Sequence, residues 1–357
     1  MRLKTFIVST LCVLVLALLW GNALADKQIV MTFLGDCTLG GEDRLLHKYY
    51  AFDSAMEEGD YGYYFRNVSD LLAQDDLTVA NLECVLRESK TGGSKDKTYV
   101  FRGEPAYTNI LTLGSVEAVG LENNHTLDYG SRGLQDTKQA LTDAGIPYFD
   151  MSDTFYYEKD GVRIAFLGLQ RAYYYTLGEE FIQKVQALHD DPDVDMVIVT
   201  LHFGEEYSAA HNRGQEVMAY RMIDAGADLI IGTHPHVVQG MEIYKDRLIL
   251  YSLGNFVFGG NSNIRSIQTI IPRITLKFSD DDELLGVKLR IYPAHISGDD
   301  SGQDNDNNYQ PVLVQGEQAQ AVYAMLDTDS ILMPAPAMET ETEQYRDYQW
   351  IDVTPRQ

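Results

Sequence analysis

Short, nearly continuous apolar runs recur along most of the chain, and amphipathic segments separate them. They predict strands at 28–34, 77–82, 116–121, 162–169, 196–201 and 229–231, then antiparallel strands at 248–251, 270–278 and 285–292. Helices are predicted at 68–73, 134–144, 181–188, 215–225 and 315–326. Alternating strands and helices indicate an α/β fold, and continuously apolar strands indicate sheets that are covered on both faces.

The two ends of the chain depart from this pattern. Residues 1–25 combine the basic Arg2 and Lys4 with an apolar run and a small-x-small ending, which is typical of a signal peptide cleaved after Ala25. The alternative is an uncleaved membrane anchor, because the two kinds of segment look alike. We expect one domain over 27–330, and an acidic tail without fixed structure over 331–357.

Acidic residues strongly outnumber basic ones. The 53 Asp and Glu against 28 Lys and Arg give a formal charge of −25. Such a chain has no electrostatic reason to bind nucleic acid or an anionic membrane. A polyanionic substrate would also be repelled at long range, so its binding would require metal ions or a local basic patch.

Two cysteines remain after the predicted signal peptide. Cys37 and Cys84 each follow an acidic residue at a predicted strand end. In an exported protein such a pair either forms a disulfide or consists of two small buried thiols, and the spacing alone does not decide between them.

Residues that bind metals follow directly after the predicted strands. They are Asp36, Glu83, Asn124, His125, His202, His234 and His236. The carboxyl ends of strands form the ligand crevice of open α/β folds, so we expect these side chains to meet. An extended backbone through Pro235 would place the imidazoles of His234 and His236 on one side. Carboxylates, an amide oxygen and imidazoles suit a centre of two divalent ions, either Mn, Fe or Zn.

Several motifs carry a resemblance to a known family. They are Gly35-Asp36, Asn81-Leu82-Glu83, Asn123-Asn124-His125 with Tyr129-Gly130, His202-Phe203-Gly204 with Glu206-Tyr207, His234-Pro235-His236-Val237 and Tyr251-Ser252-Leu253-Gly254-Asn255-Phe256. Together they resemble the CapA family of capsule synthesis, which is associated with poly-γ-glutamate and belongs to the calcineurin-like metallophosphoesterases. The resemblance covers residues 27–297 and implies a four-layer α/β/β/α sandwich with a dinuclear metal site.

The resemblance also implies roles for individual residues. Asp36 and His236 would hold the first metal, Glu83 would bridge, and the second metal would be held by Asn124, His202 and His234. His125 would be the catalytic acid facing the substrate. Two departures leave the first metal and ordinary phosphatase activity open. Thr38 stands where the superfamily has a histidine, and Glu83 stands where it has an aspartate.

The implied function is metal-dependent hydrolysis or transfer in the metabolism of poly-γ-glutamate or a related capsule or wall polymer. The implied setting is the cell surface or exterior, with an anionic polymer or phosphoester substrate and a membrane-bound polymer synthase complex as partner. One alternative is a generic phosphodiesterase or phosphatase, and another is a non-catalytic subunit for polymer export or binding.

Further residues are candidates for substrate contact or for support of the ligands: Arg102, Glu206, Tyr207 and Asn255. For Arg102 and Tyr207 we favour ordinary ion pairing or packing. The tyrosine runs at 49–50, 61–64 and 173–175 would either line a polymer groove or lie in half-buried loops.

Overall fold

A computed structural model describes residues 27–260, 262–299, 306–331, 333–334 and 344–353. The predicted signal peptide lies outside these residues. In the described part of the chain, no helix combines the length and apolar character needed to cross a membrane.

The larger sheet contains ten strands among the described residues. In order across the sheet they are β16 (Val312–Leu313), β15 (Leu284–His295), β14 (Gln268–Phe278), β1 (Lys27–Thr38), β2 (Leu77–Leu82), β5 (Ala118–Gly120) and β6 (Tyr148–Phe149), with β13 (Asn255–Phe258) on β1, and β17 (Arg346–Asp347) and β18 (Ile351–Asp352) on β15. From β13 through β1 to β6 the pairing is parallel, whereas β14 and β15 form an antiparallel hairpin.

The smaller sheet has six strands within the same described ranges. They are β11 (Met241–Tyr244), β12 (Arg247–Leu250), β10 (Leu229–Thr233), β9 (Met196–His202), β8 (Val162–Gln170) and β7 (Phe155–Lys159). The inner strands are parallel, and β7 and β11 are antiparallel edges. A separate short pair is formed by β3 (Val85–Leu86) and β4 (Arg102–Gly103).

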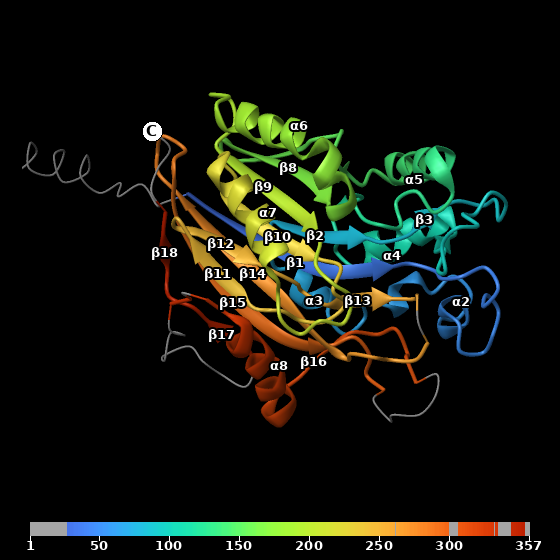
Figure 1. The fold of residues 1–357 in the computed structure, drawn as a ribbon. Coiled ribbons are helices and arrows are strands. Elements are labelled where there is room, and N and C mark those ends of the chain that lie inside the picture. The colour runs from blue at the N-terminus through green and yellow to red at the C-terminus, as the bar shows by residue number, and fades with distance from the viewer. Residues whose placement is uncertain (1–26, 261, 300–305, 332, 335–343, 354–357) are drawn as a thin grey trace, which may run out of the picture.

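The helices before residue 225 cover the outer faces of the two sheets (Figure 1), whereas the helix at Gly316–Asp329 packs into the apolar cluster shared by the sheets. The helices are α2 (Phe52–Ala55), α3 (Ser69–Leu72), α4 (Thr108–Leu113), α5 (Gly130–Ala144), α6 (Arg171–His189), α7 (Arg213–Asp224) and α8 (Gly316–Asp329), with 3-10 turns η1 (Tyr61–Tyr63) and η2 (Pro105–Tyr107). Helix α5 ends at Gly145, whose φ of 71° suits a glycine stop. Helix α7 begins at a capping box formed by Asn212 and Gln215.

Strand β9 shows why the strands read as continuously apolar. Met196 and Ile198 are buried in a cluster shared by the two sheets, whereas Val197 and Val199 are buried against helices α6 and α7. Successive residues of a strand point to opposite faces, so a strand covered on both sides needs no polar position. The predicted mixed α/β fold is therefore confirmed, with several sheets.

Two expectations are corrected by the structure. The predicted helix at 181–188 begins earlier, at Arg171, so the tyrosine run at 173–175 is helical and does not lie in a loop. In the region expected to be an unstructured tail, residues 346–347 and 351–352 form β17 and β18 on β15. Ile351 packs into the core between the sheets, and the Asp347 carboxylate accepts a 2.8 Å bond from Arg290. The acidic composition of residues 331–357 favoured an unstructured tail, and the apolar and ion-paired positions within it are too short to predict strands.

Candidate metal centre

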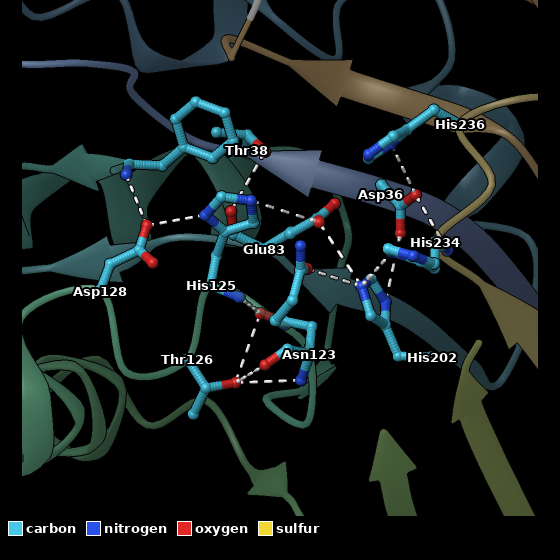
Figure 2. A network of polar contacts seen from close by, with 12 residues as sticks. Asp36, Thr38, Glu83, Asn123, His125, Thr126, Asp128, His202, His234 and His236 are labelled. Carbon is cyan, nitrogen blue, oxygen red and sulfur yellow. Dashed lines mark hydrogen bonds and ion pairs between the residues drawn. The ribbon is translucent and has the colours of Figure 1, made fainter. Parts of the chain in front are cut away.

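The predicted ligands meet where the central strands of both sheets end. Asp36 lies in β1 in register with Asn81 of β2, and His202 ends β9 opposite Thr233 of β10. The loops after β2, β5 and β10 supply the other members, Glu83, Asn124, His125, His234 and His236. Figure 2 shows Glu83 between His125 and His202. The expectation that these strand ends share one edge is met.

The candidate ligands fall into two overlapping groups. Asp36, Glu83 and His236 each offer an atom within 4.8 Å of the others, and so do Glu83, His202 and His234. Asn124 Oδ1 lies 2.8 Å from His202 Nε2 and belongs with the second group. Glu83 is common to both, as a bridging ligand would be. We call Asp36, Glu83, Asn124, His202, His234 and His236 the carboxylate–histidine centre.

The backbone carrying the two neighbouring histidines is not extended, contrary to the expectation. His234 has a φ of 100° and His236 a φ of 58°, which are rare values for residues other than glycine. Such conformations cost about 1–3 kcal/mol each and persist where surrounding contacts hold them. Here the His234 amide donates to Asp36 Oδ2 at 3.3 Å, and His236 Nδ1 lies 2.8 Å from Asn255 Oδ1. The imidazoles converge through this bend.

The backbone at Tyr251 passes so close to Gly232, two residues before His234, that only glycine fits there. A Cβ on Gly232 would lie 2.1 Å from the Tyr251 carbonyl oxygen, a distance no side chain tolerates. Glycine is therefore required at position 232 of β10, where the strand passes the Tyr251 backbone just before the two histidines.

The two carboxylates of the centre differ in how they are satisfied. Both are fully buried. Asp36 Oδ1 accepts a 2.7 Å bond from Asn81 Nδ2, and its Oδ2 lies 3.2 Å from His236 Nδ1. Among the described residues, neither carboxylate oxygen of Glu83 has a hydrogen-bond partner. Burial, and then the nearby Asp36, raise the pKa of Glu83 well above its usual value.

The three histidines of the centre differ in charge. Burial lowers the pKa of His202 well below its usual value, and burial together with His236 lowers the pKa of His234 to about 4. Burial also acts to lower the pKa of His236, but Glu83 and Asp36 outweigh it and raise the value to about 9. Neutral imidazoles are the form that binds metals, so His202 and His234 are ready as ligands at neutral pH.

His125 lies beside the centre rather than inside it. Its Nδ1 is 2.7 Å from Asp128 Oδ2, and its Nε2 is 3.9 Å from Glu83 Oε1. Lys97 binds the other oxygen of Asp128. The imidazole therefore has one nitrogen fixed by a carboxylate and the other turned toward the centre. Burial lowers the pKa of His125, and Asp128 opposes this effect.

The structure also identifies supporting residues that the sequence reasoning missed. Asn123 Nδ2 donates to the Leu82 carbonyl at 2.8 Å, and its Oδ1 accepts from the His125 amide at 3.0 Å. Thr233 Oγ1 lies 3.0 Å from His202 Nδ1. Asn123 and Thr233 each lie next to a predicted ligand in the sequence, and this adjacency could have indicated their supporting role. Asp128, three residues after His125, carried the same signal.

The residues predicted for substrate contact or support have different surroundings. Arg102 is buried and forms ordinary ion pairs with Asp43 at 2.7 Å and Glu104 at 3.0 Å. Glu206 offers an atom within 4.8 Å of His234 and His236. The Tyr207 ring lies 5.8 Å from that of His236.

Thr38 and the cysteines lie immediately behind the carboxylates. Thr38 Oγ1 donates to the Glu83 carbonyl at 3.1 Å, so it supports the Glu83 backbone. Cys37 and Cys84 are free and buried, which corresponds to the thiol alternative. Burial raises the pKa of Cys37 to about 12 and raises that of Cys84 as well, so neither is a reactive thiolate at neutral pH.

Comparison with known proteins gives the chain its relatives. It is 31% identical over 257 residues to the capsule biosynthesis protein CapA of Bacillus anthracis, covering 65% of this chain and 60% of that protein. It is 31% identical to the PGA biosynthesis protein CapA of Bacillus subtilis, covering 66% of this chain and 64% of that protein. The chain thus spans less than two thirds of the length of these relatives.

More distant comparisons give weaker likeness. A probable polyglutamine synthesis accessory protein of Mycobacterium tuberculosis is 27% identical over 264 residues, with 62% of this chain and 66% of that protein covered. The crystal structure of a hypothetical protein from Thermus thermophilus matches with a TM-score of 0.44 and 15% identity, covering 74% of this chain and 99% of that one. A likeness of that degree is too low to assign a fold.

The sequence profile described as bacterial capsule synthesis protein PGA_cap matches residues 30–260. The matched segment contains every residue of the carboxylate–histidine centre, the smaller sheet and, from residue 30 on, the parallel strands of the larger sheet, whereas β14 to β18 lie beyond it. By this match the chain belongs to the PGA_cap family of bacterial capsule synthesis proteins.

Proposed function

We propose that this protein is a metal-dependent hydrolase or transferase that acts on poly-γ-glutamate or a related capsule or wall polymer. The observation that carries the proposal is Glu83, whose fully buried carboxylate has no hydrogen-bond partner among the described residues. Buried charges in proteins are paired or coordinate metals. A divalent ion on each side of Glu83 would supply the missing partners.

The donor set fits two ions. Asp36, Glu83 and His236 would hold one, and Glu83, Asn124, His202 and His234 would hold the other, with identities among Mn, Fe and Zn. Glu206, near His234 and His236, is a further donor that offsets the loss of a histidine at Thr38. When bound, the metals would activate a water and polarise the bond to be broken.

The residues of the chain have distinct parts in such a reaction. Asp128 accepts from His125 Nδ1 and fixes the ring, so Nε2 is the nitrogen that would take a proton from the attacking water and pass it to the leaving group. Asn255 and Thr233 hold His236 and His202 in orientation from behind. The Phe101 ring stacks on His125 at 4.2 Å and limits the access of water to it.

For the fold, we propose the four-layer sandwich of the calcineurin-like metallophosphoesterases, formed by residues 27–330. Three apolar clusters support it: one between the sheets, one under α4 and α5, and one under α6 and α7. The relatives' names connect them with capsule or PGA biosynthesis. For this chain we propose the same polymer class, export to the cell surface by the signal peptide, and a membrane-bound polymer synthase complex as partner.

Metal content tests the proposal first. Elemental analysis of protein beginning at Asp26 is expected to give near-stoichiometric metal, which a His234→Ala, His236→Ala double variant loses. Turnover of polyglutamate and of a chromogenic phosphodiester would then separate polymer hydrolysis from general phosphodiesterase activity. Absence of metal after incubation with excess Mn, Fe and Zn would refute the proposal and favour a non-catalytic subunit for polymer export or binding.

A further inference from the structure

Two separate cavities adjoin the carboxylate–histidine centre. The first, of about 370 Å³, is lined by His125, His236 and Glu206. Arg265 also lines it, and we call it the Arg265 cavity. The second, of about 260 Å³, has His202 in its wall, and we call it the Arg171 cavity. No residue lines both. Small-molecule sites have volumes of about 300–1,000 Å³, so the first cavity falls within this range and the second lies just below it.

The centre itself divides the two cavities. Asn124 lines the Arg171 cavity, and its neighbour His125 lines the Arg265 cavity. His234 and His236 are divided in the same way, and their ring centroids are only 6.0 Å apart. The residues that would hold the metals therefore lie between the two cavities.

The linings of the cavities are less acidic than the chain as a whole. Acidic residues outnumber basic ones 53 to 28 overall, yet the Arg171 cavity has an arginine and no carboxylate in its lining. In the other cavity Glu42 is bound by Arg44 at 2.8 Å, and Glu206 faces the histidines, so Arg265 remains for a ligand. Arg171 Nη1 donates to the Gly204 carbonyl at 3.2 Å, and among the described residues neither Arg171 nor Arg265 forms an ion pair with a carboxylate. Each cavity thus offers a positive group to an anion.

Exposed tyrosines accompany both arginines. Tyr175 is 74% exposed at the Arg171 cavity, and Tyr99 is 46% exposed at the Arg265 cavity. The Arg265 guanidinium also lies 5.0 Å from the centre of the Tyr207 ring. Tyrosine offers an apolar face to the methylene groups of a glutamate unit and a hydroxyl to its carboxylate.

We propose that a polyglutamate chain crosses the centre, with one segment in the Arg265 cavity and the next in the Arg171 cavity. This inference rests on the proposed function and adds the path of the substrate. The amide over the centre lies inside the chain, so cleavage is internal. Hydrolysis consumes a water molecule, breaks the C–N bond, forms a C–O bond, and leaves a carboxylate on one product and an amine on the other.

The experiment uses the full metal-loaded protein and fluorescent γ-linked glutamate oligomers of increasing length. Affinity, measured by anisotropy, is expected to rise with length until both cavities are filled. Arg171→Ala and Arg265→Ala should each weaken binding of long oligomers by about tenfold, the effect of losing one charge-assisted contact. Arg132→Ala is the matched control, because Arg132 is 77% exposed, pairs with Asp136 and lines neither cavity.

Product analysis then tests internal cleavage on a polymer with free ends and on one whose two ends are blocked. Internal cleavage shortens the mean chain length steeply while few new amines appear. Release of single units from the free-ended polymer with no cleavage of the blocked one, or wild-type affinity in either arginine variant, would overturn the crossing path while leaving the proposed hydrolase intact. Length-dependent binding that needs both arginines, with no product from either polymer, would keep the crossing path and overturn the catalytic function. Stronger competition by polyphosphate than by polyglutamate would overturn the carboxylate polymer as the occupant.

Discussion

Replacing Glu83 by methionine should have effects of opposite sign with and without metal. In the metal-free protein Glu83 is fully buried and has no hydrogen-bond partner among the described residues. Burial and the nearby Asp36 both disfavour its charge, and the attraction of His236 is a smaller effect. An unsatisfied buried polar group costs about 1–3 kcal/mol. Glu83→Met should therefore raise the free energy of unfolding of the metal-free protein by about that amount.

In the presence of metal the order should reverse. A ligand at a hundred times its dissociation constant stabilises the native state by about 2.7 kcal/mol. The wild type should gain this amount, whereas Glu83→Met has lost the bridging ligand and should gain little. Urea unfolding with chelator and with saturating Mn or Zn, followed by circular dichroism, measures both values for each protein.

A matched buried carboxylate supplies the control. Glu122 is also buried, but it accepts bonds from Gln170 at 2.9 Å and from the Met151 amide at 3.2 Å. Glu122→Met leaves those donors without this acceptor, so it should destabilise the metal-free protein. If Glu83→Met destabilised the metal-free protein as Glu122→Met does, or if metal stabilised it as much as the wild type, our account of Glu83 would be wrong.

Further predictions concern the groups around the metals. The pKa of His236 is raised from 6.5 to about 9, so its contribution to metal-free stability is complete below pH 6.5 and is lost as the pH rises through about 9. Metal binding requires neutral His236, so metal affinity should rise over the same range; titration calorimetry that showed a fall would contradict this assignment. Asn255→Ala removes the partner of His236 Nδ1 and should weaken metal binding about 10- to 100-fold, as equilibrium dialysis would show. Asp128→Asn should lower kcat by about 100-fold or more at unchanged metal content, because His125 is no longer fixed; an unchanged kcat would exclude His125 as the acid.

Much of the fold could be predicted because the strands are buried on both faces. The predicted strand at 77–82 has the observed bounds of β2, and polar residues follow the other central strands as expected. The short strands β17 and β18 were not predictable, because their pairing with β15 depends on a hairpin more than fifty residues earlier in the chain. The start of α6 at Arg171 was missed since its first turns are exposed and carry no apolar periodicity.

The centre was predictable in its members but not in its geometry. Strand ends located Asp36, Glu83 and His202, because position along a parallel strand fixes the edge at which a residue lies. The left-handed backbone at His234 and His236 depends on contacts with Asp36 and Asn255, which are distant in sequence. The cavity arginines are ordinary surface residues in the sequence, and only the folded chain brings them to the centre.

The short strands that pair with the edge of β15 affect how the molecule behaves at high concentration. Strands β16, β18 and β17 each pair with a different part of its outer edge, and each is two residues long. A long exposed strand edge invites pairing between molecules, and short, interrupted edge strands prevent it. Loss of the segment after residue 334 would uncover the middle of β15 while leaving the metal ligands in place. The expected defect is self-association through backbone pairing, which β17 and β18 prevent by occupying that edge.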